Sequence, residues 1–311
     1  MSLKGRSIVE AQIFTPAIFD ELYDRTTFLL ERKPQPLFRD ETVVMLFYQP
    51  STRTRMSFQI AAVRLGAQVI YTEDAGKFSS AAKGEILEDT TRVVAGYRPR
   101  ALVLRHTEDD AAHVVAGNMT RLDRPVPVFN AGCGAEQHPT QAVLDLYSIR
   151  RELGRTDDVE IAFVGDCRYS RTVRSLAYLI AKYPGTRIHF VSVPELRVRP
   201  DIIAYLDRHD VPYTETDDWD ELVGRVDVLY MTRPQKEWFD DAAMFDRVKD
   251  RFVLDLPTAK RMKAGGRILH PLPRNTEIAL DVDPLPQAAY FRQSDYGPPL
   301  RTALFEMVCG D

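Results

Sequence analysis

The sequence predicts an α/β protein of two doubly wound domains, each a parallel sheet covered by helices on both faces. Strand-like and helix-like segments alternate along the whole chain. The strand-like segments, such as 41–48 and 160–166, are continuous apolar runs, which is typical of strands buried on both faces. The length of 311 residues also exceeds what one hydrophobic core usually serves.

The first domain is expected at residues 1–149 and opens with a helix at 15–32. Thr15 can cap this helix and Pro16 suits its first turn. Further helices are expected at 52–66, 84–97, 109–119 and 139–153. Strands are expected at 41–48, 67–72, 101–106 and 125–131.

The pattern restarts after residues 154–159, which places a second domain at 150–290. Its strands are expected at 160–166, 187–193, 226–232, 251–256 and 267–273, with helices at 172–183 and 200–209. A last helix at 298–308, within about residues 291–311, is expected to pack back on the first domain.

Composition excludes several classes of function. The net charge of −4 and pI of about 5.9 give no electrostatic footprint for nucleic acid. No apolar run approaches the roughly 18–20 residues that span a bilayer, and no signal peptide is recognisable. Three scattered cysteines fit neither a disulfide framework nor a zinc site, so we expect no metal and a cytoplasmic location.

Ligands of open parallel sheets bind just past the carboxyl ends of the strands. Nearly every such turn here carries an arginine or a histidine: Arg53, Arg55, Arg105, His106, His138, Arg168, Arg171, Arg233, His270 and Arg274. Cations gathered at one rim repel each other unless an anion neutralises them. We therefore expect small polyanionic ligands with planar oxygens, which suit the guanidinium fork.

The stretch Ser-Thr-Arg-Thr-Arg that begins at Ser51 stands between a predicted strand and a predicted helix. Free N–H groups at a helix start bind phosphate, and Ser51, Thr52 and Thr54 add hydroxyl donors. Arg53 and Arg55 oppose the helix dipole by about 0.3–1 kcal/mol each unless an anion docks between them. Neither a Walker loop nor Gly-x-Gly-x-x-Gly is present, which argues against a nucleotide.

These motifs resemble the aspartate/ornithine carbamoyltransferases, the transcarbamylase family. The resemblance is carried by Ser-Thr-Arg-Thr-Arg at 51–55, His-Pro-Thr-Gln at 138–141 and His-Pro-Leu-Pro-Arg at 270–274, with further matches at 83–90, 105–106 and 231–237. The ornithine branch usually has His-Cys-Leu-Pro in the third motif, so this chain looks closer to the aspartate branch. The resemblance implies an active site in the cleft between the domains, no cofactor, and carbamoyl transfer from carbamoyl phosphate to L-aspartate in pyrimidine synthesis.

The resemblance also implies the site residues. The catalytic set is Arg53, Thr54, Lys83, Arg105 and His138. Carbamoyl phosphate would contact Ser51, Thr52, Arg53, Thr54, Ser79, Lys83, Arg105, His138, Gln141, Pro271 and Leu272. Aspartate would contact Lys83, Arg171, Arg233, Gln235 and Leu272.

Two of these assignments have a physical basis in the sequence. His138 directly precedes Pro139 at a helix start, where an imidazole resists protonation and a neutral ring can donate to the carbonyl oxygen. Leu272-Pro273 is a candidate cis peptide, because only X-Pro bonds adopt that form cheaply. Its backbone carbonyls would then face the carbamoyl NH2 and the incoming amine, although a plain proline-rich turn is an alternative. Arg274 suits either a binding or a structural role.

Ser79 and Lys83 lie in a polar loop of small residues before a helix. In the family, the matching residues reach into the neighbouring subunit's site, which implies a homotrimer with shared active sites. The resemblance leaves open whether a regulatory chain or a dihydroorotase partner attaches.

Two positions depart from the family pattern, and alternatives remain open. Gln49 stands where the aspartate branch commonly has Glu, and Trp238 where Arg is common. These positions indicate either an aspartate enzyme with altered domain closure or a paralogue acting on another amine. A non-catalytic relative that serves as a scaffold or anion sensor is a separate alternative. His106, Cys133 and Cys167 are interpreted as structural, since direct amine attack needs no covalent intermediate.

Overall fold

Parallel β-pairing organises the chain into two units, which are described separately. The computed structural model describes residues 2–121, 123, 125–234, 239 and 242–310. Unit 1 comprises Met1–Leu144 with Asp295–Asp311, and unit 2 comprises Asp145–Ser294. The division falls inside a single helix, α6 (Pro139–Leu153).

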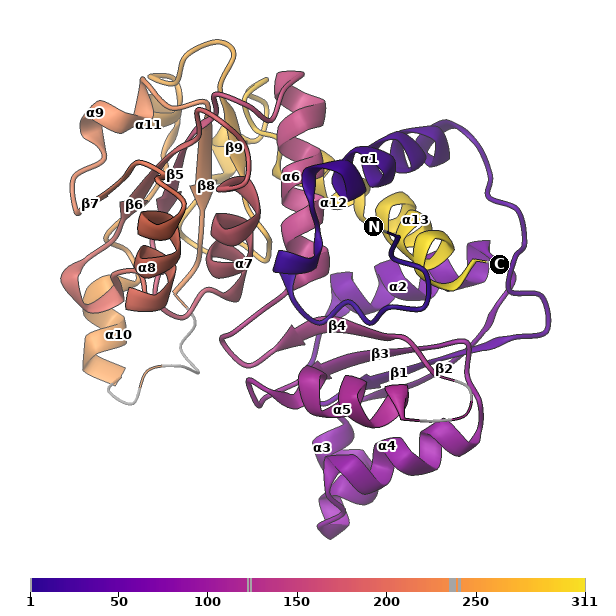
Figure 1. Ribbon diagram of the computed structural model, residues 1–311. Coiled ribbons are helices and arrows are strands. Elements are labelled where there is room, and N and C mark those ends of the chain that lie inside the picture. The colour runs from indigo at the N-terminus through magenta and orange to yellow at the C-terminus, as the bar shows by residue number, and fades with distance from the viewer. Residues whose placement is uncertain (1, 122, 124, 235–238, 240–241, 311) are drawn as a thin grey trace. The chain divides into compact units, whose positions relative to one another are not determined.

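Unit 1 is a four-stranded parallel sheet in the order β2-β1-β3-β4. Its strands are β1 (Thr42–Phe47), β2 (Gln68–Glu73), β3 (Ala101–His106) and β4 (Val128–Cys133). Its helices are α1 (Pro16–Glu31), α2 (Thr52–Arg64), α3 (Ala75–Phe78), α4 (Leu87–Gly96), α5 (Ala111–Thr120) and α13 (Gly297–Cys309), with the start of α6. Helices α1, α2 and α13 cover one face of the sheet, and α4 and α5 cover the other (Figure 1).

Alternate strand residues supply the two cores of unit 1. Leu102 and Leu104 of β3 are fully buried in a cluster with residues of α4 and α5. On the other face, Phe129 of β4 packs edge-on against Phe305 of α13, with ring centroids 4.8 Å apart. The C-terminal helix is also held by polar contacts, because buried Arg301 donates to Ser57 Oγ at 3.0 Å.

Unit 2 is a five-stranded parallel sheet in the order β7-β6-β5-β8-β9. Its strands are β5 (Glu160–Val164), β6 (Arg187–Val191), β7 (Tyr213–Thr216), β8 (Val228–Met231) and β9 (Arg267–Leu269). Its helices are α7 (Arg171–Ile180), α8 (Pro200–Arg208), α9 (Asp220–Val223), α10 (Ala242–Val248), α11 (Leu256–Ala259) and α12 (Tyr290–Asp295), with the end of α6. Strand residues such as Val164 and Met231 are buried against α9, α11 and α12.

The predicted fold class is confirmed in both units, and so is the Thr15 cap, whose side chain accepts from Ile18 N. The expected strand at 251–256 is wrong. Leu254 makes only an isolated bridge to Ile278, because Asp255 caps α11 and turns the chain into a helix. Strand β7 was not predicted, since its residues are only half-buried or exposed and lack an apolar run. No helix in the described ranges is long and apolar enough to cross a membrane.

Candidate active site

Three neighbouring strand ends define the candidate site of unit 1. Strands β1, β3 and β4 are adjacent and parallel, so their carboxyl ends lie side by side at the same end of the sheet. The backbone N–H of Tyr48 extends this pairing by donating to Arg105 O at 2.8 Å. The segments that follow these strands carry the predicted carbamoyl phosphate ligands.

Thr54 and His138 lie 84 residues apart in the sequence and meet near the carboxyl ends of these strands. Thr54 Oγ1 is 3.4 Å from His138 Nε2, and both side chains are buried. The carbonyl of His138 accepts the backbone N–H of Gln141 at 2.9 Å, so His138 stands at the start of α6 as expected. Gln141 is also buried in the first turn of this helix.

Arg105 is the last residue but one of β3 and is half-buried. Its guanidinium donates through Nη1 to the carbonyl of Ala131 on β4, at 3.0 Å. This bond fixes the side chain along the carboxyl edge of the sheet.

The start of α2 presents hydroxyl and guanidinium groups. Ser51 occupies the cap position with an extended backbone, and in the described structure its side chain makes no capping bond. Thr52 and Arg53 are exposed in the first turn. A helix start of this kind, with N–H groups and hydroxyl side chains, is suited to binding an anion.

Arg55 has a role that the sequence did not indicate. It forms an ion pair with Glu73 of β2 at 3.1 Å, and its guanidinium carbon lies 5.1 Å from the centroid of the Tyr71 ring. Within unit 1, an acidic residue of the edge strand thus offsets the charge of Arg55, whereas Arg53 stays assigned to the phosphate as a prediction.

Ser79 and Lys83 follow the edge strand β2. Ser79 caps the 3-10 helix Ser80–Lys83 by accepting from Ala81 N at 3.2 Å, and it donates to Ala75 O at 2.5 Å. Lys83 is exposed in the last turn of that helix. Within this chain, the described contacts of Ser79 are local.

The predicted aspartate ligands of unit 2 also follow neighbouring strands. Arg171 is the first residue of α7 and is buried, and Ser170 caps the helix by accepting from Val173 N. Arg233 follows β8, which pairs with β5 in the sheet, and is half-buried. Gln235 and Trp238 lie outside the described residues.

A buried polar cluster joins the ends of β5 and β8. Thr232 Oγ1 accepts from Asp166 N and donates to Val164 O, both at 2.8 Å. Gly165 has φ +109°, and a Cβ there would lie 2.6 Å from Thr232 O. Glycine is required at this position, because any side chain would force the two strand ends apart.

Asp166 is a buried acidic residue after β5 that was not identified from the sequence. Its Oδ1 accepts the backbone N–H groups of Arg168 and Tyr169, whereas its fully buried Oδ2 has no partner in the described part of the chain. Burial raises the pKa of Asp166 to about 6. An acidic residue directly after an apolar strand was the available signal.

The turn after β9 adopts the predicted geometry. The peptide bond Leu272-Pro273 is cis, and Pro271 and Leu272 are half-buried. Arg274 donates to both carboxylate oxygens of Asp283 and, at 3.1 Å, to Tyr290 Oη. These contacts assign Arg274 a structural role within unit 2.

The residues interpreted as structural are buried. His106 packs edge-on against Tyr48 and accepts from Glu108 N, and burial lowers the pKa of His106. Cys133 and Cys167 are buried free thiols, and burial raises the pKa of Cys167. A protonated, inaccessible thiol is a poor nucleophile. Within the described ranges, no group of three or more His, Cys, Asp or Glu residues could hold a metal ion.

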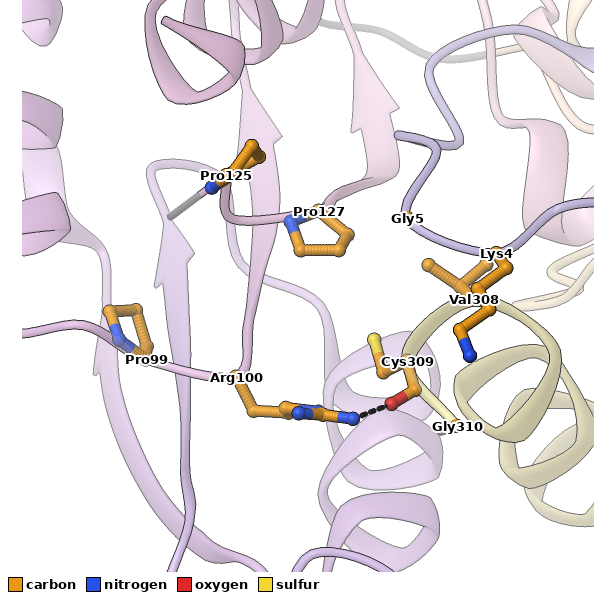
Figure 2. Close-up of a pocket in the computed structure, with 9 residues that line it drawn as sticks. All are labelled: Lys4, Gly5, Pro99, Arg100, Pro125, Pro127, Val308, Cys309 and Gly310. Atoms are coloured by element: carbon orange, nitrogen blue, oxygen red, sulfur yellow. Dashed lines mark hydrogen bonds between the residues drawn. The ribbon is translucent and has the colours of Figure 1, made fainter. Parts of the chain in front are cut away.

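A cavity of about 230 Å³ lies at the other end of the unit 1 sheet, beside the amino ends of β3 and β4. Figure 2 shows that its lining includes Pro99 and Arg100, just before β3, and Pro127, just before β4. Arg100 donates to the carbonyl of Cys309 at the end of α13. The cavity is therefore at the amino ends of the strands and is separate from the candidate site.

Both units match known protein domains in sequence. Residues 6–151 match the carbamoyl-phosphate-binding domain of the aspartate/ornithine carbamoyltransferases, and residues 157–308 match the Asp/Orn-binding domain. The aspartate carbamoyltransferase catalytic subunit of Methanocaldococcus jannaschii is 44% identical over 94% of this chain and 93% of its own. The chloroplastic aspartate carbamoyltransferase of Oryza sativa is 43% identical over 99% of this chain and 86% of its own. The aspartate transcarbamoylase of Trypanosoma cruzi with carbamoyl phosphate and aspartate has a TM-score of 0.92, at 34% identity over 98% and 97% of the two chains.

Proposed function

The chain belongs to the aspartate/ornithine carbamoyltransferase family, and on this premise we propose that it transfers the carbamoyl group of carbamoyl phosphate to the α-amine of L-aspartate. The amine nitrogen attacks the carbonyl carbon, the bond from that carbon to the phosphate oxygen breaks, and the amine gives up one proton. The products are N-carbamoyl-L-aspartate and phosphate. We place this reaction in de novo pyrimidine synthesis.

The observation that carries the proposal is the meeting of Thr54 and His138 beside the strand that carries Arg105. Three donors from separate segments at one sheet edge suit a carbonyl oxygen that gains negative charge during attack. Gln141 is assigned to the carbamoyl NH2. The start of α2, with Ser51, Thr52 and Arg53, is assigned to the departing phosphate.

In unit 2, Arg171 and Arg233 are assigned to the two carboxylates of aspartate. Both follow adjacent parallel strands, and arginine binds carboxylates bidentately. The carbonyl of Leu272 is assigned to the carbamoyl NH2 and the incoming amine. Gln235 belongs to the same proposed set by resemblance alone.

The test of this function is a colorimetric assay of ureido product with carbamoyl phosphate fixed and a panel of amines. We expect L-aspartate to be the preferred acceptor. Preference for another amino acid or amine would indicate a paralogue of different specificity, which Gln49 makes worth testing. Binding of carbamoyl phosphate without turnover of any amine would indicate a non-catalytic relative.

We further propose a homotrimer in which Ser79 and Lys83 complete the site of a neighbouring chain. An apolar surface of unit 1 supports this proposal, because Met56, Ile60 and Val63 are exposed along one face of α2. Ile70 and Tyr71 are exposed on the adjacent edge strand β2, directly before the segment that carries Ser79 and Lys83. Exposed apolar patches of this kind mark interfaces.

Mixing two inactive variants tests the shared site. We expect Lys83→Ala and Arg53→Ala chains to recover part of the activity together, because some hybrid sites then contain both native residues. No recovery would show that each chain is self-sufficient. A cytoplasmic location is also proposed, supported by three free, buried thiols that suit a reducing compartment.

A further inference from the structure

The backbone of Leu272 is held by a buried imidazole in unit 2. The N–H of Leu272 donates to His270 Nδ1 at 2.7 Å. Leu272 has φ +53°, a left-handed conformation that is unfavourable for a residue with a branched side chain. This hydrogen bond therefore stabilises a backbone geometry that leucine would not otherwise adopt.

The same hydrogen bond fixes the tautomer of His270. An Nδ1 that accepts a hydrogen bond carries no proton, so the proton of the neutral ring is on Nε2. His270 Nε2 lies 2.7 Å from Glu277 Oε1 and donates to it. His270 and Glu277 are both 2% exposed, so this contact is shielded from bulk solvent.

Both carboxylate oxygens of Glu277 accept hydrogen bonds. Its Oε2 accepts the backbone N–H of Asn275 at 3.0 Å, while its Oε1 accepts from His270. The hydrogen bond from His270 lowers the pKa of Glu277 against the opposing effect of burial, which favours a carboxylate. Two donors therefore face this side chain, and only a carboxylate satisfies both.

A second buried chain of hydrogen bonds fixes the backbone of His270. Its N–H donates to Gln293 Oε1 at 3.0 Å, and Gln293 Nε2 donates to Asp145 Oδ1 at 2.6 Å. Asp145 Oδ2 in turn accepts from Tyr230 Oη at 2.7 Å. Asp145 belongs to α6 and Tyr230 to β8, so both ends of the network are anchored in regular secondary structure.

We propose that His270 and Glu277, anchored through Gln293 and Asp145, are positioning residues that aim the backbone of Leu272 at the reacting carbamoyl group. This inference rests on the proposed function, in which the carbonyl of Leu272 accepts from the carbamoyl NH2 and the amine. The network acts through Leu272. Its loss lowers turnover, because misplacing a group by about 1 Å can cost about a hundredfold.

Two substitutions of His270 separate positioning from simple stability. His270→Asn keeps an acceptor near the position of Nδ1 and loses the contact with Glu277. His270→Gln keeps an amide near the position of Nε2 and loses the acceptor for Leu272. We expect kcat to fall about tenfold in His270→Asn and about a hundredfold in His270→Gln.

Unit 1 supplies an internal readout, since it carries the proposed phosphate site. Titration with inorganic phosphate should give the same Kd, within about twofold, in wild type and both variants. Thr276→Val is the matched control, because Thr276 is exposed in the same turn and its described side-chain bond, to Asp250 Oδ1 at 2.7 Å, lies outside the His270 network. Equal losses of kcat in the Asn and Gln variants, or unchanged kcat in His270→Gln, would overturn the proposal.

Nitrogen NMR of histidine-labelled wild type tests the network without any substitution. We expect an unprotonated Nδ1 and a protonated Nε2 for His270, and the opposite tautomer would overturn the assignment. The result also separates the two hypotheses. A wild-type protein that shows this tautomer but no carbamoyl transfer would refute the proposed function and leave the hydrogen-bond network intact.

Discussion

Apart from Arg171, which begins helix α7, the two units hold their candidate residues at strand ends by different means. In unit 1, Thr54 and His138 stand at the starts of α2 and α6, so regular secondary structure positions them. In unit 2, Arg233 and Leu272 lie in irregular turns, and buried hydrogen bonds of Thr232 and His270 position the backbone around them. Substitutions in unit 1 should therefore affect chemistry with little effect on folding, whereas those in unit 2 should affect both.

The largest effect is expected for Arg105→Ala in unit 1. Loss of one donor to a developing oxyanion costs about 10²–10³ in kcat, or about 3–4 kcal/mol. The unfolding midpoint should change little, because Arg105 is only half-buried, near the carboxyl end of β3. Steady-state kinetics and thermal unfolding measure the two quantities. Arg64→Ala, an exposed arginine at the end of α2, is the control, and a loss below about fivefold would refute the assignment of Arg105.

An intermediate effect, measured as stability at neutral pH, is expected for Asp166→Asn in unit 2. The raised pKa of about 6 means that folding favours the protonated acid. The stability contributed by this group is present below about pH 4 and is lost as the pH rises through about 6. The asparagine variant is neutral throughout, so its stability relative to wild type should increase by about 3 kcal/mol across this window.

Urea unfolding at a series of pH values measures this difference. Asp157→Asn, which changes an exposed acid near the start of unit 2, should show no such trend. A difference between Asp166→Asn and wild type that stays flat, or falls with rising pH, would show that folding does not favour the protonated acid.

The smallest effect is expected for Glu73→Gln in unit 1. The pair with Arg55 is partly exposed, and such ion pairs contribute about 0–1 kcal/mol. Arg55 pairs with Glu73 on β2 and is not assigned to ligand binding. KM for carbamoyl phosphate should therefore stay within about twofold of wild type in this variant. A much larger rise in KM would mean that Arg55 takes part in ligand binding, and would weaken the contrast between the two units.

The sequence alone determined the fold class and the candidate strand ends. Apolar runs of strand length alternate with helical patterns, and parallel sheets place functional residues after their strands, so Ser51, Arg105, His138 and Arg171 could be identified without coordinates. The cis bond at Leu272-Pro273 was also predictable, because only proline makes that geometry cheap. Sequence patterns predict a structural feature when the residues that cause it are close neighbours along the chain.

Only the tertiary structure decided the partners of the polar side chains. The pairing of Arg55 with Glu73, the burial of Asp166 and the bond from Leu272 N–H to His270 depend on which segments the fold brings together. The expected strand at 251–256 failed for the same reason, since an apolar run forms a strand only where a neighbouring backbone pairs with it. Hydrogen bonds and burial depend on distance in space, and separation along the chain does not encode that distance.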